Sequence, residues 1–190
     1  MTHKNYLEDL NNSKKTFIIY KSNKGFDLYT DFSKRIILTN NNVKRFINES
    51  TKLKSKRKET DLFIGFFGYE ILNNLIGVKV KKQKGLKFPK GIFYKPETKL
   101  KLPIKLNYRN LGIVKPNTLF KININKTSYK IIFNKFKKKI KSGETYQIKI
   151  CTKYRNKTQI DALDFFCRLV KSNMAPEAFM IKDKDYSIIS

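Results

Sequence analysis

Few side chains in this 190-residue chain are of the types that carry acid–base, nucleophilic or metal chemistry. The single histidine is His3, and the cysteines Cys151 and Cys167 lie in apolar stretches without a C-x-x-C motif. We therefore predict that both cysteines are small buried residues in a reducing, cytoplasmic environment. Three acids, Glu144, Asp161 and Asp164, are interpreted as isolated surface-type residues that form no pair facing a common site. No catalytic residue and no metal ligand is assigned.

The apolar run Leu62–Tyr69 contains Gly65 and Gly68, a spacing that also occurs in phosphate-binding loops. It lacks the Lys-Ser/Thr of a P-loop and the third glycine of a dinucleotide fingerprint. We therefore interpret both glycines as packing residues of a buried strand. The run is also too short to cross a bilayer, and the N-terminus lacks an apolar signal core, so no membrane partner is expected.

Most of the chain is predicted to form short strands with a few helices. The clearest helix starts at Thr127 or Ser128, ends at Gly143, and carries one apolar stripe: Tyr129, Ile132, Phe133, Phe136 and Ile140. Further helices are expected at 43–48, 70–76 and 161–173. Strands are expected at 16–20, 26–30, 35–39, 62–69, 92–94, 98–106, 119–124, 145–150, 178–181 and 186–190. This pattern predicts an α+β fold, mainly an antiparallel sheet with flanking helices.

The net charge of +27 favours an anionic partner such as nucleic acid. However, the basic residues are 36 Lys and only 6 Arg, beside 18 Asn and 3 Ala. Arginine is the usual phosphate-clamping and base-reading residue, so a genome-wide codon bias explains this composition at least as well as a binding surface. Either origin predicts salt-sensitive, nonspecific binding to polyanions.

Three stretches in order resemble a known enzyme family. They are Gly65–Glu70 (GFFGYE), residues 143–154 (GETYQIKICTKY) and residues 172–181 (SNMAPEAFMI). They are similar to the G-x-x-G-Y-[DE], G-[DE]-x-[FY]-Q-[VI] and N-P-S-P or N-x-A-P stretches of component I of anthranilate synthase and aminodeoxychorismate (para-aminobenzoate) synthase. These are chorismate-utilising enzymes, and the resemblance covers only their N-terminal portion.

The resemblance implies an incomplete part of the family's two-lobed sheet sandwich. Residues 1–15 are then a loose N-terminal segment, and residues 16–125 are the strand-rich N-terminal region of component I. Residues 126–190 are the start of the chorismate-binding domain, truncated at Ser190. The residues that hold the metal and perform acid–base chemistry lie in the family's C-terminal half, so we expect residues 1–190 to be inactive alone.

The resemblance also implies a reaction, a cofactor and a partner. Chorismate is aminated, with Mg2+, by ammonia from a glutamine amidotransferase subunit, and anthranilate synthase then eliminates pyruvate. The residues present here are not expected to bind the Mg2+. Alanine before Pro176 and the Tyr146-Gln147 pair favour aminodeoxychorismate synthase, of the folate pathway, over anthranilate synthase, of tryptophan biosynthesis. A basic RNA-binding protein without enzymatic activity is an alternative of another class, based on the eight lysines between Lys121 and Lys141.

An effector pocket is a further implication of the resemblance. Tryptophan-regulated relatives use an L-L-E-S stretch, which aligns with residues 18–22 here, and the N-P-S-P loop. Ser22, Asn173 and Pro176 are retained, but Lys21 replaces the glutamate. An ammonium group cannot hold an amino group by the ion pair that a carboxylate makes, so feedback control by tryptophan is not expected.

Overall fold

The computed structural model describes residues 3–52, 58–78, 88–106, 108, 119–157, 160–173 and 175–190. The chain divides into two compact units, each described by itself below. Met1–Arg109 with Ala162–Ser190 form the first, here the sheet unit, and Asn110–Asp161 form the second, here the helix unit. The last 29 residues, 162–190, belong with the N-terminal part in the sheet unit. The division of the chain into family regions at 125/126 stays a prediction.

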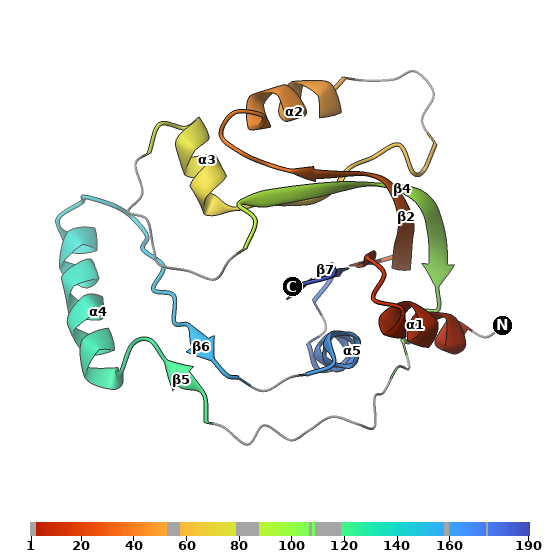
Figure 1. Cartoon of the computed structure of the whole chain (residues 1–190). Coiled ribbons are helices and arrows are strands. Elements are labelled where there is room, and N and C mark those ends of the chain that lie inside the picture. The colour runs from red at the N-terminus through yellow and green to blue at the C-terminus, as the bar shows by residue number, and fades with distance from the viewer. Residues whose placement is uncertain are drawn as a thin grey trace. The chain divides into compact units, whose positions relative to one another are not determined.

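A six-stranded antiparallel sheet is the frame of the sheet unit (Figure 1). Its spatial order is β3 (Ile64–Phe67), β4 (Gly91–Leu102), β2 (Gly25–Ile37), β1 (Phe17–Ser22), β7 (Ala178–Lys182) and β8 (Ser187–Ile189). Every neighbouring pair in this order is antiparallel. Among the residues that the structure describes, four helices accompany it: α1 (His3–Asn12), α2 (Val43–Ser50), α3 (Tyr69–Leu75) and α5 (Ala162–Ser172). The predicted α+β class is confirmed.

The two sides of the sheet have separate cores because side chains alternate along a strand. Phe17, Ile19 and Leu28 pack with α1 and α5, whereas Ile18 and Tyr29 pack with residues of β4 and β7. A third cluster lies at α2 and α3. In α5, Leu163, Phe166 and Cys167 are buried.

The N-terminal residues differ from the predicted loose segment. They form helix α1, whose Leu7 and Leu10 are buried against the sheet. The ammonium of Lys182 in β7 donates to the carbonyl oxygen of Asn11 at 2.8 Å, which fixes the end of the helix. The apolar residues are few, but their three-residue spacing puts them on one helix face.

Two pairs of predicted strands are each one continuous strand. The predicted strand 26–30 and the first part of 35–39 belong to β2, which ends at Ile37 and bends at a bulge between Phe32 and Lys34, beside Asp31 with a φ of 51°. The predicted strand 92–94 and the first part of 98–106 belong to β4, which ends at Leu102 and runs beside β2 over most of its length. Pro96 is tolerated within β4 because β3 pairs only as far as Tyr94.

The glycines Gly65 and Gly68 are packing residues, as predicted. A Cβ atom on Gly65 would lie 1.9 Å from the carbonyl oxygen of Ile92, and one on Gly68 would lie 2.4 Å from that of Lys90. Neither position has room for a side chain, since the contacting atoms are backbone.

The helix unit contains α4 (Lys126–Lys141) and a two-stranded ladder of β5 (Lys121–Ile122) and β6 (Tyr154–Arg155). The predicted helix is confirmed, and Gly143 ends it with a φ of 74°. Its N-cap is Asn125, whose side chain accepts from the Ser128 amide at 2.8 Å, rather than the predicted Thr127 or Ser128.

The predicted strand at 145–150 is absent, and Tyr146 is 92% exposed. Alternation alone does not make a strand, since the backbone also needs a partner strand, and none of the described strands pairs with these residues. Cys151 was predicted to be buried but is exposed, since the strand that would have placed it against a core is absent. Across the part of the chain that the structure describes, no helix has the length and apolarity to cross a membrane.

Candidate functional sites

The strand order brings two of the predicted effector segments together. Because β1 lies next to β7, Lys21 pairs with Ala178, and its side chain reaches the loop before β7. The Lys21 ammonium donates to the carbonyl oxygens of Ala175 at 2.6 Å and Pro176 at 3.4 Å. Lys21 therefore uses its charge to hold the backbone of the Pro176 loop.

The other predicted residues make only local contacts in the structure. The Ser22 hydroxyl accepts from the amide of Lys24 at 3.2 Å in the β1–β2 turn. Asn173 is exposed at the end of α5, and its amide donates to the Leu169 carbonyl oxygen at 2.8 Å. Beside this loop, burial raises the pKa of Tyr20, and a hydrogen bond with Glu177 raises it further. An effector pocket at Ser22, Asn173 and Pro176 stays a prediction.

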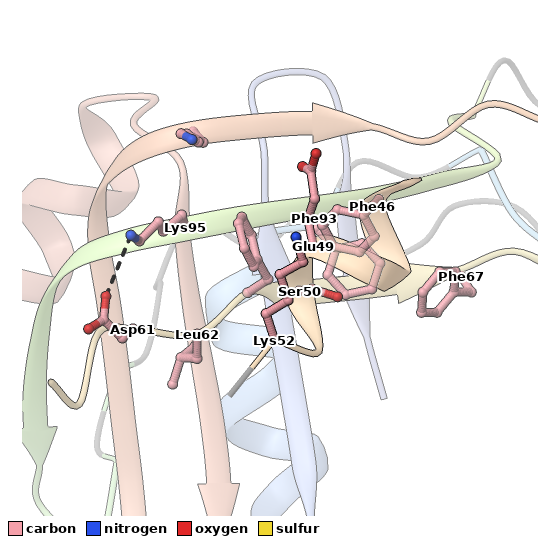
Figure 2. A pocket seen from close by; sticks show the side chains of 11 residues that line it. Phe46, Glu49, Ser50, Lys52, Asp61, Leu62, Phe67, Phe93 and Lys95 are labelled. Atoms are coloured by element: carbon pink, nitrogen blue, oxygen red, sulfur yellow. Dashed lines mark ion pairs between the residues drawn. The ribbon is translucent and has the colours of Figure 1, made fainter. Parts of the chain in front are cut away.

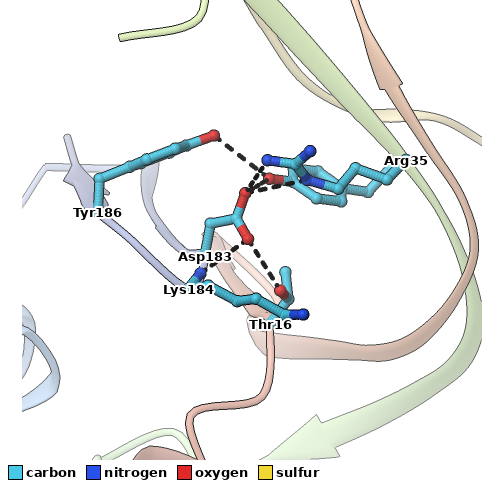
Figure 3. Close-up of polar contacts among 6 residues, drawn as sticks. Thr16, Arg35, Asp183, Lys184 and Tyr186 are labelled. Carbon is cyan, nitrogen blue, oxygen red and sulfur yellow. Dashed lines mark hydrogen bonds and ion pairs between the residues drawn. The ribbon is translucent and has the colours of Figure 1, made fainter. Parts of the chain in front are cut away.

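A buried carboxylate, Asp183, lies at the centre of a polar cluster (Figure 3). Its Oδ2 atom accepts from the Tyr94 hydroxyl at 2.6 Å and from two Arg35 nitrogens, Nη2 at 2.8 Å and Nε at 3.2 Å. Its Oδ1 atom accepts from the Thr16 hydroxyl at 3.1 Å and from the Lys184 amide at 2.7 Å. One side chain thereby links β2, β4, the start of β1 and the β7–β8 turn.

The electrostatics of this cluster favour the ionised form of Asp183 at neutral pH. Burial alone would raise the pKa of Asp183, but the hydrogen bonds from Tyr94, Arg35 and the Lys184 amide together lower it to about 2. Burial, followed by the hydrogen bond to Asp183, raises the pKa of Tyr94 well above its usual value. Asp183 is therefore ionised and fully hydrogen-bonded, which suits a structural role better than proton transfer.

Sequence reasoning missed the Asp183 cluster. The sequence around it, KDKD, predicts only a turn, and the turn is present. The partners Thr16, Arg35 and Tyr94 are at least 89 residues away along the chain, so their meeting depends on the strand order. No local sequence pattern indicates the order of the strands in the sheet.

The described residues do not fit a Mg2+ site. No group of three or more His, Cys, Asp or Glu side chains among them could hold a metal ion. The buried carboxylates each face cations instead of a second acid: Asp27 with Lys99 and Lys101, Asp164 with Arg168, and Asp183 with Arg35. Magnesium prefers carboxylate oxygens together with water, so none of these sites suits it.

A cavity of about 460 Å³ opens between α2, β3 and β4 (Figure 2). Phenylalanine rings form much of its wall, and charged side chains from four segments surround them. The sequence did not predict this cavity, because α2 and β4 are separated by 40 residues along the chain.

Comparison with known proteins connects the C-terminal part of the chain to an enzyme class. Residues 105–190 match the family model described as chorismate binding enzyme. The match supports a relation to the chorismate-utilising enzymes, with chorismate as the substrate of the family. It includes the helix unit together with α5, β7 and β8 of the sheet unit. No curated protein matches the chain.

Proposed function

We propose that the chain is the N-terminal part of a chorismate-utilising component I, whose reaction is the amination of chorismate to aminodeoxychorismate. The family match at residues 105–190 carries this proposal. Two of the three stretches behind the resemblance, residues 143–148 and 173–179, fall within the matched region. The third, Gly65–Glu70, lies outside the match and supports it independently.

The residues of the loop before β7 favour aminodeoxychorismate over anthranilate as the product. Ala175 precedes Pro176 as in the N-x-A-P form of the stretch, and Lys21 holds this loop through two carbonyl oxygens. A positively charged group at that place disfavours the ammonium of an amino-acid effector. Anthranilate synthase component I is the alternative within the same family.

The proposed reaction takes place in the cytoplasm and needs two further components. A glutamine amidotransferase subunit would supply ammonia, and Mg2+ would be held by carboxylates of the intact enzyme. Since the described residues do not fit this metal, we propose that the metal ligands and the acid–base residues come from the C-terminal half of a complete component I.

The test is to express the protein from its natural gene, with all of the sequence that the reading frame encodes. Chorismate and Mg2+ are added with either ammonium or glutamine and an amidotransferase subunit, and mass spectrometry identifies the product. Aminodeoxychorismate supports the proposal, and anthranilate selects the alternative. Unchanged chorismate under both ammonia sources would contradict both. Residues 1–190 alone serve as the control, from which we expect no product.

A further inference from the structure

The floor of the cavity between α2, β3 and β4 is a cluster of phenylalanine rings. Phe93 lies with its ring centre 4.7 Å from that of Phe46 and 4.8 Å from that of Phe67, and Phe63 lies 5.3 Å from Phe46. Phe46 is buried, while the other three are half-buried and border the cavity. The exposed parts of these rings suit a flat apolar ligand, because aromatic rings pack well in tilted and edge-on arrangements.

Charged side chains surround the aromatic floor (Figure 2). Lys34 of β2, Lys52 after α2 and Lys95 of β4 contribute ammonium groups, and Glu49 and Asp61 contribute carboxylates. Each carboxylate already has a cationic partner. Asp61 lies 3.5 Å from the Lys95 ammonium, and Glu49 lies 2.7 Å from Nε of Arg45, outside the cavity lining.

Positive charge therefore exceeds negative charge at the mouth of the cavity. The hydrogen bond from Arg45 is the largest cause that lowers the pKa of Glu49, and the nearby charges of Lys52 and Lys34 lower it further. Glu49 is one carboxylate beside three cations, Arg45, Lys52 and Lys34. The other carboxylate, Asp61, is paired with Lys95. An anion that approaches Lys34 and Lys52 meets a net positive field.

We propose that this cavity binds a small aromatic carboxylate, with its ring on the phenylalanine floor and its carboxylate between Lys34 and Lys52. The volume of about 460 Å³ lies within the usual range of small-ligand pockets. The combination of a hydrophobic wall with few charged groups is typical of such sites. A neutral ring lacks the attraction to the lysines, and an aliphatic carboxylate lacks the ring contacts.

The site is separate from the chorismate chemistry and from the effector segments. Its residues belong to α2, β2, β3, β4 and the segment before β3, all outside residues 105–190. The inference therefore does not rest on the proposed function, and the two can fail independently.

The experiment is a binding titration of the full chain with 4-hydroxybenzoate, followed by amide chemical shifts in NMR. Benzyl alcohol, which lacks the carboxylate and the ring hydroxyl, and acetate, which lacks the ring, are the comparison probes. We expect saturable binding of 4-hydroxybenzoate, with shifts in α2 and β4, and at least tenfold weaker binding of either comparison probe. Equal binding of benzyl alcohol, or no saturable binding of 4-hydroxybenzoate, would overturn the proposal.

Variants test the lysines without disturbing the core. Lys34→Gln with Lys52→Gln should weaken 4-hydroxybenzoate binding at least tenfold, since both side chains are exposed and the fold should persist. Lys24→Gln, in the β1–β2 turn outside the cavity lining, is the control and should leave binding unchanged. Equal losses in the double variant and the control would indicate general charge attraction and would refute the site.

Discussion

The two units of the chain differ in how much of their apolar surface is buried. The sheet unit has three clusters of buried side chains, on both sides of the sheet and at α2 and α3. In the helix unit, none of the described residues is buried. The apolar stripe of α4 is partly open to solvent, with Tyr129, Phe133 and Ile140 each more than 40% exposed. Long-range packing holds the first unit together, whereas capping and helix propensity hold the second.

The difference also shows that sequence similarity and structural units need not share boundaries. The family match starts at residue 105 and spans both units. Its last elements, α5, β7 and β8, complete the sheet unit, where β7 pairs with β1 from the opposite end of the chain. The part of the chain that matches chorismate enzymes therefore includes strands that the N-terminal residues need for their own core.

The largest expected effect comes from truncating the shared core of the sheet unit. Phe166 of α5 is fully buried and contacts Phe26 of β2 edge-on, with ring centres 6.4 Å apart. Phe166→Ala should lower the free energy of unfolding by about 3–5 kcal/mol, measured by urea denaturation. The matched change in the helix unit, Phe133→Ala, should cost less than about 1 kcal/mol because Phe133 is 46% exposed. Similar losses for both variants would contradict the comparison.

The second effect concerns the polar cluster that joins strands of the sheet unit. Asp183→Asn removes the charge that pairs with Arg35 and should cost about 2–3 kcal/mol in urea denaturation, because buried donors lose a charged acceptor. The estimate is modest because the Arg35 side chain is 45% exposed. Asp185→Asn, two residues along the same turn and exposed, is the control and should change stability little. A neutral outcome for Asp183→Asn would show that the cluster is not stabilising.

The pH dependence of stability should identify the same carboxylate. The pKa of Asp183 is lowered from 3.8 to about 2, so its contribution to stability is present above about pH 4 and is lost as the pH falls through about 2. Thermal unfolding between pH 5 and pH 2 should show a decline that is steeper in the natural protein than in Asp183→Asn. Parallel declines in the two proteins would assign the acid sensitivity to other carboxylates.

The smallest effect is expected at the N-cap of α4. Asn125→Ala removes the side-chain acceptor of the Ser128 amide and should destabilise the helix by about 1 kcal/mol. Far-ultraviolet circular dichroism should detect the loss of helix, with no change in the urea midpoint of the sheet unit. Asn134→Ala, in the middle of the same exposed helix, is the control and should preserve or increase helicity. Loss of the sheet unit's stability on Asn125→Ala would contradict independent stabilisation of the two units.

Local patterns predicted the elements whose signals are local. The 3.6-residue period and Gly143 predicted α4, and the strands expected at 178–181 and 186–190, on either side of a polar turn, are the β7–β8 hairpin. The sequence predicted two separate strands in place of β2 and two in place of β4. It does not show that β2 and β4 pair with each other at ten positions, which keeps each strand continuous. The strand predicted at 145–150 failed for the converse reason, because its alternation has no partner strand among the described residues.

The functional features also divide into those with a local signal in the sequence and those that depend on contacts between distant segments. The family resemblance depends on short stretches and was visible in the sequence. The Lys21 contact with the Pro176 loop, the Asp183 cluster and the cavity all combine residues far apart in the chain. Their discovery requires the strand order, which places β1 between β2 and β7.

Amide hydrogen exchange of the full chain, analysed peptide by peptide, tests the contrast between the two units most directly. Amides of β1, β2 and α5 should exchange only through global unfolding of the sheet unit, whereas those of α4 should exchange through local opening, orders of magnitude faster. This result would establish that α4 forms without a buried face of its own. Equal protection of α4 and β1 would show that the helix stripe is covered in solution, and would contradict the account.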